Sequence, residues 1–135
     1  MALLVWNDSY SVGVRSLDHQ HTGLFESLNE LHAAMMIGKA NSLTGPLLHK
    51  LVDYTKKHFA AEEAMLAAAH YPMLSQHRVL HRDLIRKVNE YAARFERGEI
   101  SLSVDLLNFL RDWLTTHIMK EDHQYGSWLN DHGVH

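Results

Sequence analysis

The sequence predicts an all-α protein, folded as an up-down-up-down antiparallel four-helix bundle with an extended N-terminal arm. Apolar residues recur close to the 3.6-residue period of an α-helix along almost the whole chain. The four periodic stretches are joined by short connections, which favours antiparallel packing of neighbours. With 135 residues, of which 46% are hydrophobic, the chain has the size of one domain with its own core. We therefore expect a single domain over residues 1–135.

Breaks in the helical period mark the arm and the first two helices. Residues 1–17 have no sustained helical period and contain β-branched and turn-forming residues, which indicates an extended segment. The first helix is expected over 18–37, because Gly38 stops it. The second helix is expected over 45–69, with Pro46 in its first turn, where a missing N–H is tolerated.

Two further helices complete the predicted bundle. Pro72 separates them from the second helix, because proline cannot continue a helix. The third helix is expected over 73–97 and ends before Gly98. The fourth is expected over 103–125, with Ser103 as a suitable N-cap.

The composition excludes several classes of protein. The 13 basic and 16 acidic residues give a net charge of -3, which argues against binding to nucleic acid or to an anionic membrane. The absence of cysteine excludes disulfides, thiolate zinc sites and iron–sulfur clusters. No apolar run is long enough to span a membrane and no signal peptide is recognisable, so we expect a cytoplasmic protein. We also expect a monomer, because no large self-complementary apolar stripe is evident.

Histidine is the unusual feature, with 12 residues in 135. Five histidines lie in phase with the apolar stripes of their helices: His21, His58, His77, His81 and His117. A buried imidazole without a partner costs about 1–3 kcal/mol, so five of them favour a shared metal centre over separate core histidines. The pairs His77/His81 and His58/Glu62 support this, because residues four apart lie on one helix face. The other seven are expected to be exposed to solvent: His19, His32, His49, His70, His123, His132 and His135.

Nitrogen and oxygen ligands without thiolate suit iron, manganese, zinc or copper. Six or seven protein ligands exceed the needs of one ion and suggest two metals that share bridging carboxylates. The Glu-x-x-His pattern of ferritin-like bundles is absent, and so is the HExxH pattern of metalloproteases. A histidine-rich diiron site is therefore the interpretation that fits best. A metal store and a metal-free interaction bundle are the alternatives outside this class.

Four segments resemble the hemerythrin family in its bacterial single-domain form. They are residues 18–21 (DHQH), residues 58–63 (HFAAEE), His77 with His81, and residues 117–122 (HIMKED). Trp6 in the arm and Tyr125-Gly126 near the end match as well, so the resemblance covers nearly the whole chain. It implies one hemerythrin-like domain whose four-helix bundle holds a non-haem diiron centre that binds O2 reversibly.

The resemblance also implies a role for each candidate ligand. One iron would be bound by three histidines, His77, His81 and His117. The other would be bound by His21 and His58, which leaves a position open for O2. Two carboxylates, Glu62 and Asp122, would bridge the irons together with an oxo or hydroxo group derived from solvent.

The choice of Asp122 rests on the resemblance and not on helical spacing. Asp122 is five residues after His117, about 140° away around an ideal helix, whereas Glu121 at four residues would share its face. Spacing alone favours Glu121. A bridging Asp122 requires a local distortion of the helix, such as a π-bulge, or a carboxylate that reaches sideways.

The leading expectation is an oxygen carrier, store or delivery protein and not an enzyme. Apolar side chains near the ligands would keep the bound O2 dry, and the candidates are Phe25, Phe59, Trp113 and Leu114. Leu114, one turn before His117, is the first candidate for controlling ligand access. The alternatives are a diiron enzyme with peroxidase, oxidase or NO-handling activity, and an O2 or redox sensor. The expected binding partners are O2 and either an oxygen-consuming enzyme or a reductase.

Overall fold

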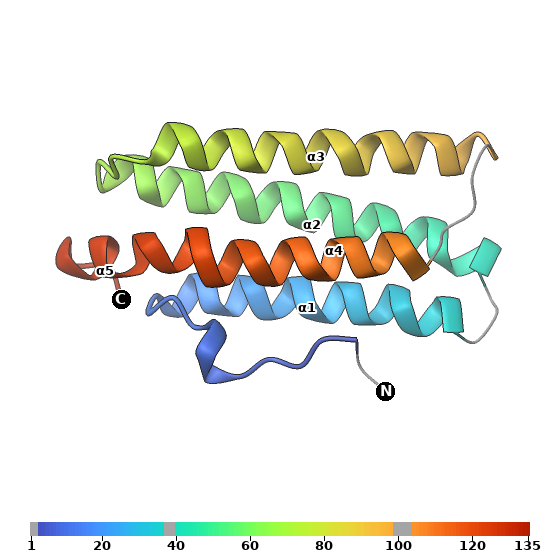
Figure 1. The fold of residues 1–135 in the computed structure, drawn as a ribbon, viewed down its shortest axis with the longest axis horizontal. Helices are drawn as coiled ribbons and strands as arrows, with labels where there is room; N and C mark the ends of the chain where they lie inside the picture. Colours follow the sequence, from blue (N-terminus) through green and yellow to red (C-terminus); the bar gives the residue numbers. More distant parts are fainter. Residues whose placement is uncertain (1–2, 37–39, 99–103) are drawn as a thin grey trace.

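Four long helices form an antiparallel bundle in the computed structural model, which describes residues 3–36, 40–98 and 104–135. The elements are η1 (Asp8–Tyr10), α1 (Arg15–Met36), α2 (Ala40–Ala68), α3 (Leu74–Glu96), α4 (Val104–His117), η2 (Ile118–Asp122) and α5 (His123–Asp131). The chain reverses direction from each long helix to the next (Figure 1). α1 packs against α2 and α4, and α2 packs against α3. The predicted four-helix bundle is confirmed.

Several predicted helix boundaries differ from the observed ones. α1 begins at Arg15, and α2 begins at Ala40, so Pro46 lies inside α2 and not in its first turn. Pro46 lies near the N-terminal end of α2, where its missing N–H costs a single backbone hydrogen bond. The expected N-cap Ser103 and the expected end of the first helix at Ile37 fall outside the described residues.

The last helix continues beyond its predicted end. The helical path of α4 passes through η2, a turn of π-helix, into α5 and stops at Asp131 instead of at residue 125. The arm contacts this continuous helix at one place, because η1 packs against η2. Two reciprocal hydrogen bonds hold the arm on α1: the Leu4 N–H donates to Asn29 Oδ1 and Asn29 Nδ2 donates to the Leu4 carbonyl, both at 2.8 Å. The arm is therefore part of the packed structure.

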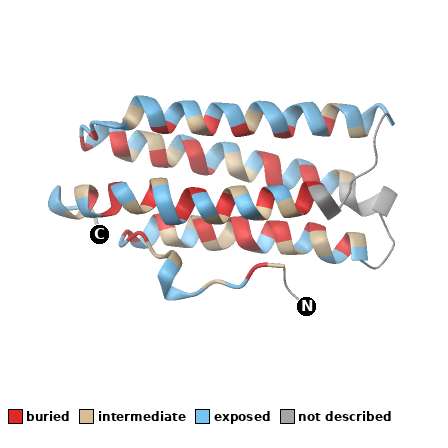
Figure 2. Cartoon of the chain, viewed as in Figure 1, coloured by how far each residue is buried: buried red, intermediate tan, exposed pale blue. Residues whose placement is uncertain are grey.

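Buried residues follow the inner side of the four long helices over the described part of the bundle (Figure 2). At the end near the α3–α4 connection the core is apolar, with Leu28, Leu51, Val88 and Leu107 all buried. At the opposite end the buried residues include most of the ionisable groups described below. None of the helices in the described part of the chain is long and apolar enough to cross a membrane.

Candidate metal centre

The alternating direction of the helices gathers the predicted site residues at one end of the bundle. That end holds the first halves of α1 and α3, the second half of α2 and the end of α4 with η2 (Figure 1). The seven predicted ligands are all buried there, each at most 4% exposed: His21, His58, Glu62, His77, His81, His117 and Asp122. So many buried ionisable groups in one place indicate a charged centre and not ordinary core packing.

The possible ligand atoms form two groups. Within each group they all lie within 4.8 Å of one another. One group contains three histidines and two carboxylates: His77, His81, His117, Glu62 and Asp122. The other contains His21, His58 and, again, Glu62. Two adjacent metal positions with a common carboxylate fit this arrangement.

Glu62 lies between the two groups and offers one oxygen to each. Its Oε1 lies 2.6 Å from His77 Nε2 and 3.2 Å from His81 Nε2. Its Oε2 lies 3.2 Å from His58 Nε2 and 3.4 Å from His21 Nε2. A carboxylate in this position is placed to bridge two ions.

Asp122 also reaches both groups. Its Oδ1 lies 3.0 Å from His77 Nε2 and 3.1 Å from His117 Nε2. Its Oδ2 lies 3.2 Å from His21 Nε2, in the other group. Asp122 therefore has the same two-sided position as Glu62.

A π-helical turn brings Asp122 to this place. Over Ile118–Asp122 the backbone is π-helical, and the His123 N–H donates to the carbonyl of Ile118, five residues earlier. Five residues therefore fill the turn that four fill in an α-helix, so Asp122 comes back beneath His117. Glu121 stays outside the cluster, with its Oε2 3.6 Å from the outer nitrogen, Nδ1, of His117. The structure thus contains the helix distortion that a bridging Asp122 requires.

Mutual contacts shift the pKa values of the buried groups. Burial alone would lower the pKa of His21, but Asp122 and Glu62 outweigh it and raise the pKa to about 9. The pKa of His77 rises to about 9 against the effect of burial for the same reason. Burial lowers the pKa of His58, and Glu62 offsets this only in part. Burial would raise the pKa of Glu62, yet the surrounding histidines hold it well below its ordinary value.

Four buried atoms of the cluster make no hydrogen bond, namely both ring nitrogens of His21 and both carboxylate oxygens of Asp122. Buried polar atoms are normally satisfied, because each one left without a partner costs about 1–3 kcal/mol. Three of these atoms, His21 Nε2 and the two Asp122 oxygens, face other ligand atoms of the cluster. The residues present therefore fit metal ions held by nitrogen and oxygen ligands.

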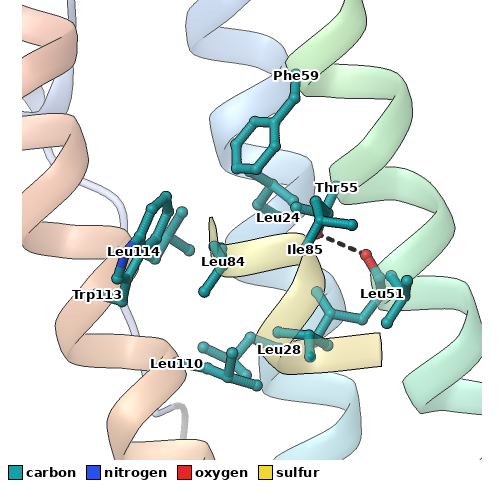
Figure 3. A pocket seen from close by; sticks show the side chains of 12 residues that line it. Leu24, Leu28, Leu51, Thr55, Phe59, Leu84, Ile85, Leu110, Trp113 and Leu114 are labelled. Atoms are coloured by element: carbon teal, nitrogen blue, oxygen red, sulfur yellow. Dashed lines mark hydrogen bonds between the residues drawn. The ribbon is translucent and has the colours of Figure 1, made fainter. Parts of the chain in front are cut away.

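An apolar cavity of about 40 Å³ lies between the four long helices (Figure 3). Phe59 and Trp113 line it, and each also stacks on a candidate ligand: Phe59 on His81 with ring centroids 3.6 Å apart, and Trp113 on His117 at 4.5 Å. The polar lining side chain Thr55 donates its hydroxyl hydrogen to the Leu51 carbonyl at 2.7 Å. The cavity therefore offers water few hydrogen-bond partners.

Three of the four predicted pocket residues line this cavity: Phe59, Trp113 and Leu114. Phe25 does not line it. Its ring is buried against the aromatic rings of the arm, 5.5 Å from Trp6 and 5.0 Å from Tyr10 between centroids. Helical phase correctly predicted that Phe25 faces inward but could not show that the arm covers it.

Sequence reasoning missed three residues that contact the cluster from neighbouring helices. Gln20 Oε1 lies 2.6 Å from His58 Nδ1, and Glu63 Oε2 lies 3.0 Å from His81 Nδ1. The fully buried Tyr125 donates its hydroxyl hydrogen to Glu62 Oε2 at 2.8 Å. Each of these contacts joins two different helices, so no spacing within one helix could have revealed it.

The other seven histidines lie outside the cluster. The five that are exposed, as predicted, are His19, His49, His70, His132 and His135. The prediction was wrong for His32 and His123, which are half-buried. His32 follows the buried Leu31 on α1, and His123 follows Asp122 directly with its Nε2 atom buried.

Comparison with known proteins identifies the family of this chain. The model of the hemerythrin HHE cation-binding domain matches residues 12–129. The chain belongs to the hemerythrin family. Bacteriohemerythrin of Stenotrophomonas maltophilia is 38% identical over 132 residues, which are 98% of this chain and 85% of that protein. Bacteriohemerythrin of Pseudomonas aeruginosa is 38% identical over 125 residues, covering 93% and 80%.

The solved hemerythrins share the fold. A wild-type hemerythrin crystal structure superimposes with a TM-score of 0.90 at 33% identity and covers 95% of this chain and 98% of that one. Hemerythrins are non-haem diiron proteins that bind O2 and are not typical enzymes. The buried histidine and carboxylate cluster of this chain is able to hold metal.

Proposed function

We propose that this chain binds O2 reversibly at a diiron centre and acts as an oxygen carrier, store or delivery protein. One observation carries the proposal: two ligand groups share the buried Glu62, and an apolar cavity lies beside them. Two irons would supply the electrons that reversible binding of O2 requires. The cofactor would be two iron ions per chain with a bridging oxo or hydroxo group.

The ligand roles follow the two groups of atoms. His77, His81 and His117 would bind one iron, and His21 with His58 would bind the other. Two carboxylates, Glu62 and Asp122, would bridge the pair, since each points one oxygen toward each group. The group with two histidines supplies fewer ligands. The iron bound there would therefore keep an open coordination position, to which O2 would bind.

The residues around the centre would admit O2 and exclude water. The cavity has room for a diatomic molecule, since about 10–15 Å³ on the same measure holds one water. Leu114 lines it and is only 9% exposed, so we propose that its side chain controls access. Trp113 lines this cavity and, together with His117, a surface groove near Phe109, so we propose that it helps to separate the centre from solvent.

We also propose that residues 1–135 form a single hemerythrin domain. The family match covers 12–129, and the arm before it packs on α1 and η2. We propose that the protein acts as a monomer and exchanges O2 with an oxygen-consuming enzyme, with a reductase that restores the ferrous state.

A diiron enzyme is the second candidate function. Such an enzyme would consume peroxide or O2, or handle NO, at the same ligands. The short apolar cavity favours a carrier, because among its lining side chains only Thr55 and Trp113 carry a polar atom and neither is an acid or a base.

Optical spectroscopy distinguishes the two functions. Protein loaded with ferrous iron is exposed to O2 and then returned to anaerobic conditions. A carrier gains a near-ultraviolet and visible charge-transfer absorption that disappears when O2 is removed. If the protein instead passes in a single step to a stable oxidised form that turns over added peroxide, the result would contradict a carrier and support a diiron enzyme.

A further inference from the structure

The five histidines of the cluster differ in what their outer nitrogens meet. On the side with three histidines, two of the outer nitrogens, those of His81 and His117, face carboxylates. His81 Nδ1 lies 3.0 Å from Glu63 Oε2, within hydrogen-bond distance, and His117 Nδ1 lies 3.6 Å from Glu121 Oε2. Both carboxylates are about three-quarters buried, with 24% of each side chain exposed.

On the side with two histidines, no described residue places a carboxylate at the outer nitrogens. His58 Nδ1 faces the neutral amide oxygen of Gln20 at 2.6 Å. His21 Nδ1 is buried and makes no hydrogen bond. The two groups of ligands therefore differ in the number of imidazoles and also in the charge of the side chains that face the outer nitrogens.

Glu63 is itself held in place. Its Oε1 lies 3.3 Å from Arg78 Nε, while its other oxygen meets His81. Arg78 and His81 are both on α3, and Glu63 comes from α2, directly after Glu62. Neighbouring residues of α2 therefore serve two purposes: Glu62 points into the cluster, and Glu63 supports a histidine from behind.

A carboxylate behind an imidazole has two effects on a bound metal. It accepts the hydrogen of Nδ1, so Nε2 presents its lone pair to the centre and the ring cannot rotate freely. Its negative charge also makes the ring a stronger donor. An amide such as that of Gln20 provides the first effect without the second.

We infer that Glu63, assisted by Glu121, is a positioning residue that makes the three-histidine position the stronger of the two metal positions. Gln20 leaves the two-histidine position the weaker one. This inference rests on the proposed function, because it assumes that both positions take iron. Glu121 contributes less, since 3.6 Å is too long for a hydrogen bond.

The test follows the release of iron to a chelator from protein loaded anaerobically with Fe(II). Wild-type protein is expected to lose one iron in a fast phase and one in a slow phase. Glu63→Gln keeps an acceptor but removes the charge, and should speed the slow phase about 10-fold. Glu63→Ala removes both effects and should speed the slow phase about 100-fold. Glu63→Asp keeps the carboxylate, so its slow phase should be closer to that of the wild type than the slow phase of Glu63→Ala. The fast phase should not change in any of them.

Two further variants complete the design. Asp53→Asn removes one negative charge from the exposed face of α2 and is the matched control, for which both phases should equal the wild type. Gln20→Glu places a carboxylate behind His58 and should slow the fast phase. The unfolding temperature of metal-free Glu63→Gln should stay at the wild-type value.

The outcomes separate the inference from the function on which it rests. Equal release from Glu63→Gln and Asp53→Asn, with two irons bound in each, would overturn the inference and leave the proposed function standing. A faster slow phase together with a matching loss of stability in the metal-free protein would assign the effect to folding and also overturn it. A wild-type chain that takes up no iron would overturn both.

Discussion

Asp122 and Glu121 are adjacent acidic residues whose surroundings differ completely. Asp122 is 1% exposed and lies within 3.2 Å of histidines from both ligand groups, whereas Glu121 faces only the outer side of His117. Asp122→Asn should therefore reduce the iron content from two to one per chain or fewer, because a neutral amide is a poor bridging ligand. Glu121→Gln, with the same change in charge, should keep two. Elemental analysis of both variants measures this, and equal retention of iron by them would refute the role of Asp122.

The raised pKa values of His21 and His77 predict how the stability of the metal-free protein depends on pH. Both values rise from 6.5 to about 9, so the folded state binds protons more tightly than the unfolded state. This stabilisation is complete below pH 6.5 and is lost as the pH rises through 9. The lowered pKa of His58 acts in the opposite sense, and its contribution is complete above 6.5.

The free energy of unfolding of metal-free protein, measured in urea from pH 7 to pH 10, should therefore fall. The iron-loaded protein is the control, because there the metal and not a proton neutralises the carboxylates. A flat profile for the metal-free protein would contradict the close contacts between these histidines and the carboxylates.

Helical phase predicted the buried face of each site histidine and of Glu62. It could not select Asp122, because it assumes an α-helix, and on an α-helix Glu121 shares the face of His117. The resemblance to hemerythrins supplied Asp122 instead. Glu63 could not be predicted because its contact with His81 joins α2 to α3.

At the scale of elements, the helical period alone could reveal neither the π turn nor the packing of the arm, although the arm itself and a distortion at Asp122 were expected. The π turn exchanges one pattern of backbone hydrogen bonds for another, and no residue type within Ile118–Asp122 demands it. The arm has no period to interpret, yet it buries Leu4, Val12 and Val14. The place of the arm depends on packing against α1 and η2, which lie far from it in the chain.

Gly126 of α5 has no side chain, which allows the backbone of the arm to approach α5 closely at Val12. A Cβ added there would lie 2.3 Å from the backbone oxygen of Val12, which no flexible side chain can relieve. Gly126→Ala should therefore lower the free energy of unfolding by about 1–3 kcal/mol, as overpacking does. Gly45→Ala, inside α2 and in ordinary contact with Phe95, is the matched control. Its gain in helix propensity is opposed by the crowding of the new Cβ against the ring of Pro46, so it should change the free energy of unfolding by less than about 1 kcal/mol.

Urea unfolding of the two glycine variants gives these values, and limited proteolysis of the arm shows where the damage lies. The arm of Gly126→Ala should be cleaved faster than that of the wild type. Equal stability of Gly126→Ala and Gly45→Ala would show that the arm does not need this close approach.

At the scale of the whole molecule, the bundle divides into an apolar end and an end that holds the ligands. The apolar period and the short connections of the sequence predicted the antiparallel arrangement, and that arrangement brings the ligand-bearing parts of four helices to one end. The ligand end buries both carboxylates and five imidazoles, and its unsatisfied atoms make it costly without a metal. We therefore expect the metal to stabilise the fold as well as to bind O2.

The most direct test of the account is the iron content of the purified chain after anaerobic loading with Fe(II) and removal of loosely bound metal. The account predicts two irons per chain, because two ligand groups share Glu62. No tightly bound iron, or one iron per chain that excess Fe(II) does not raise, would contradict the diiron centre and the function proposed from it.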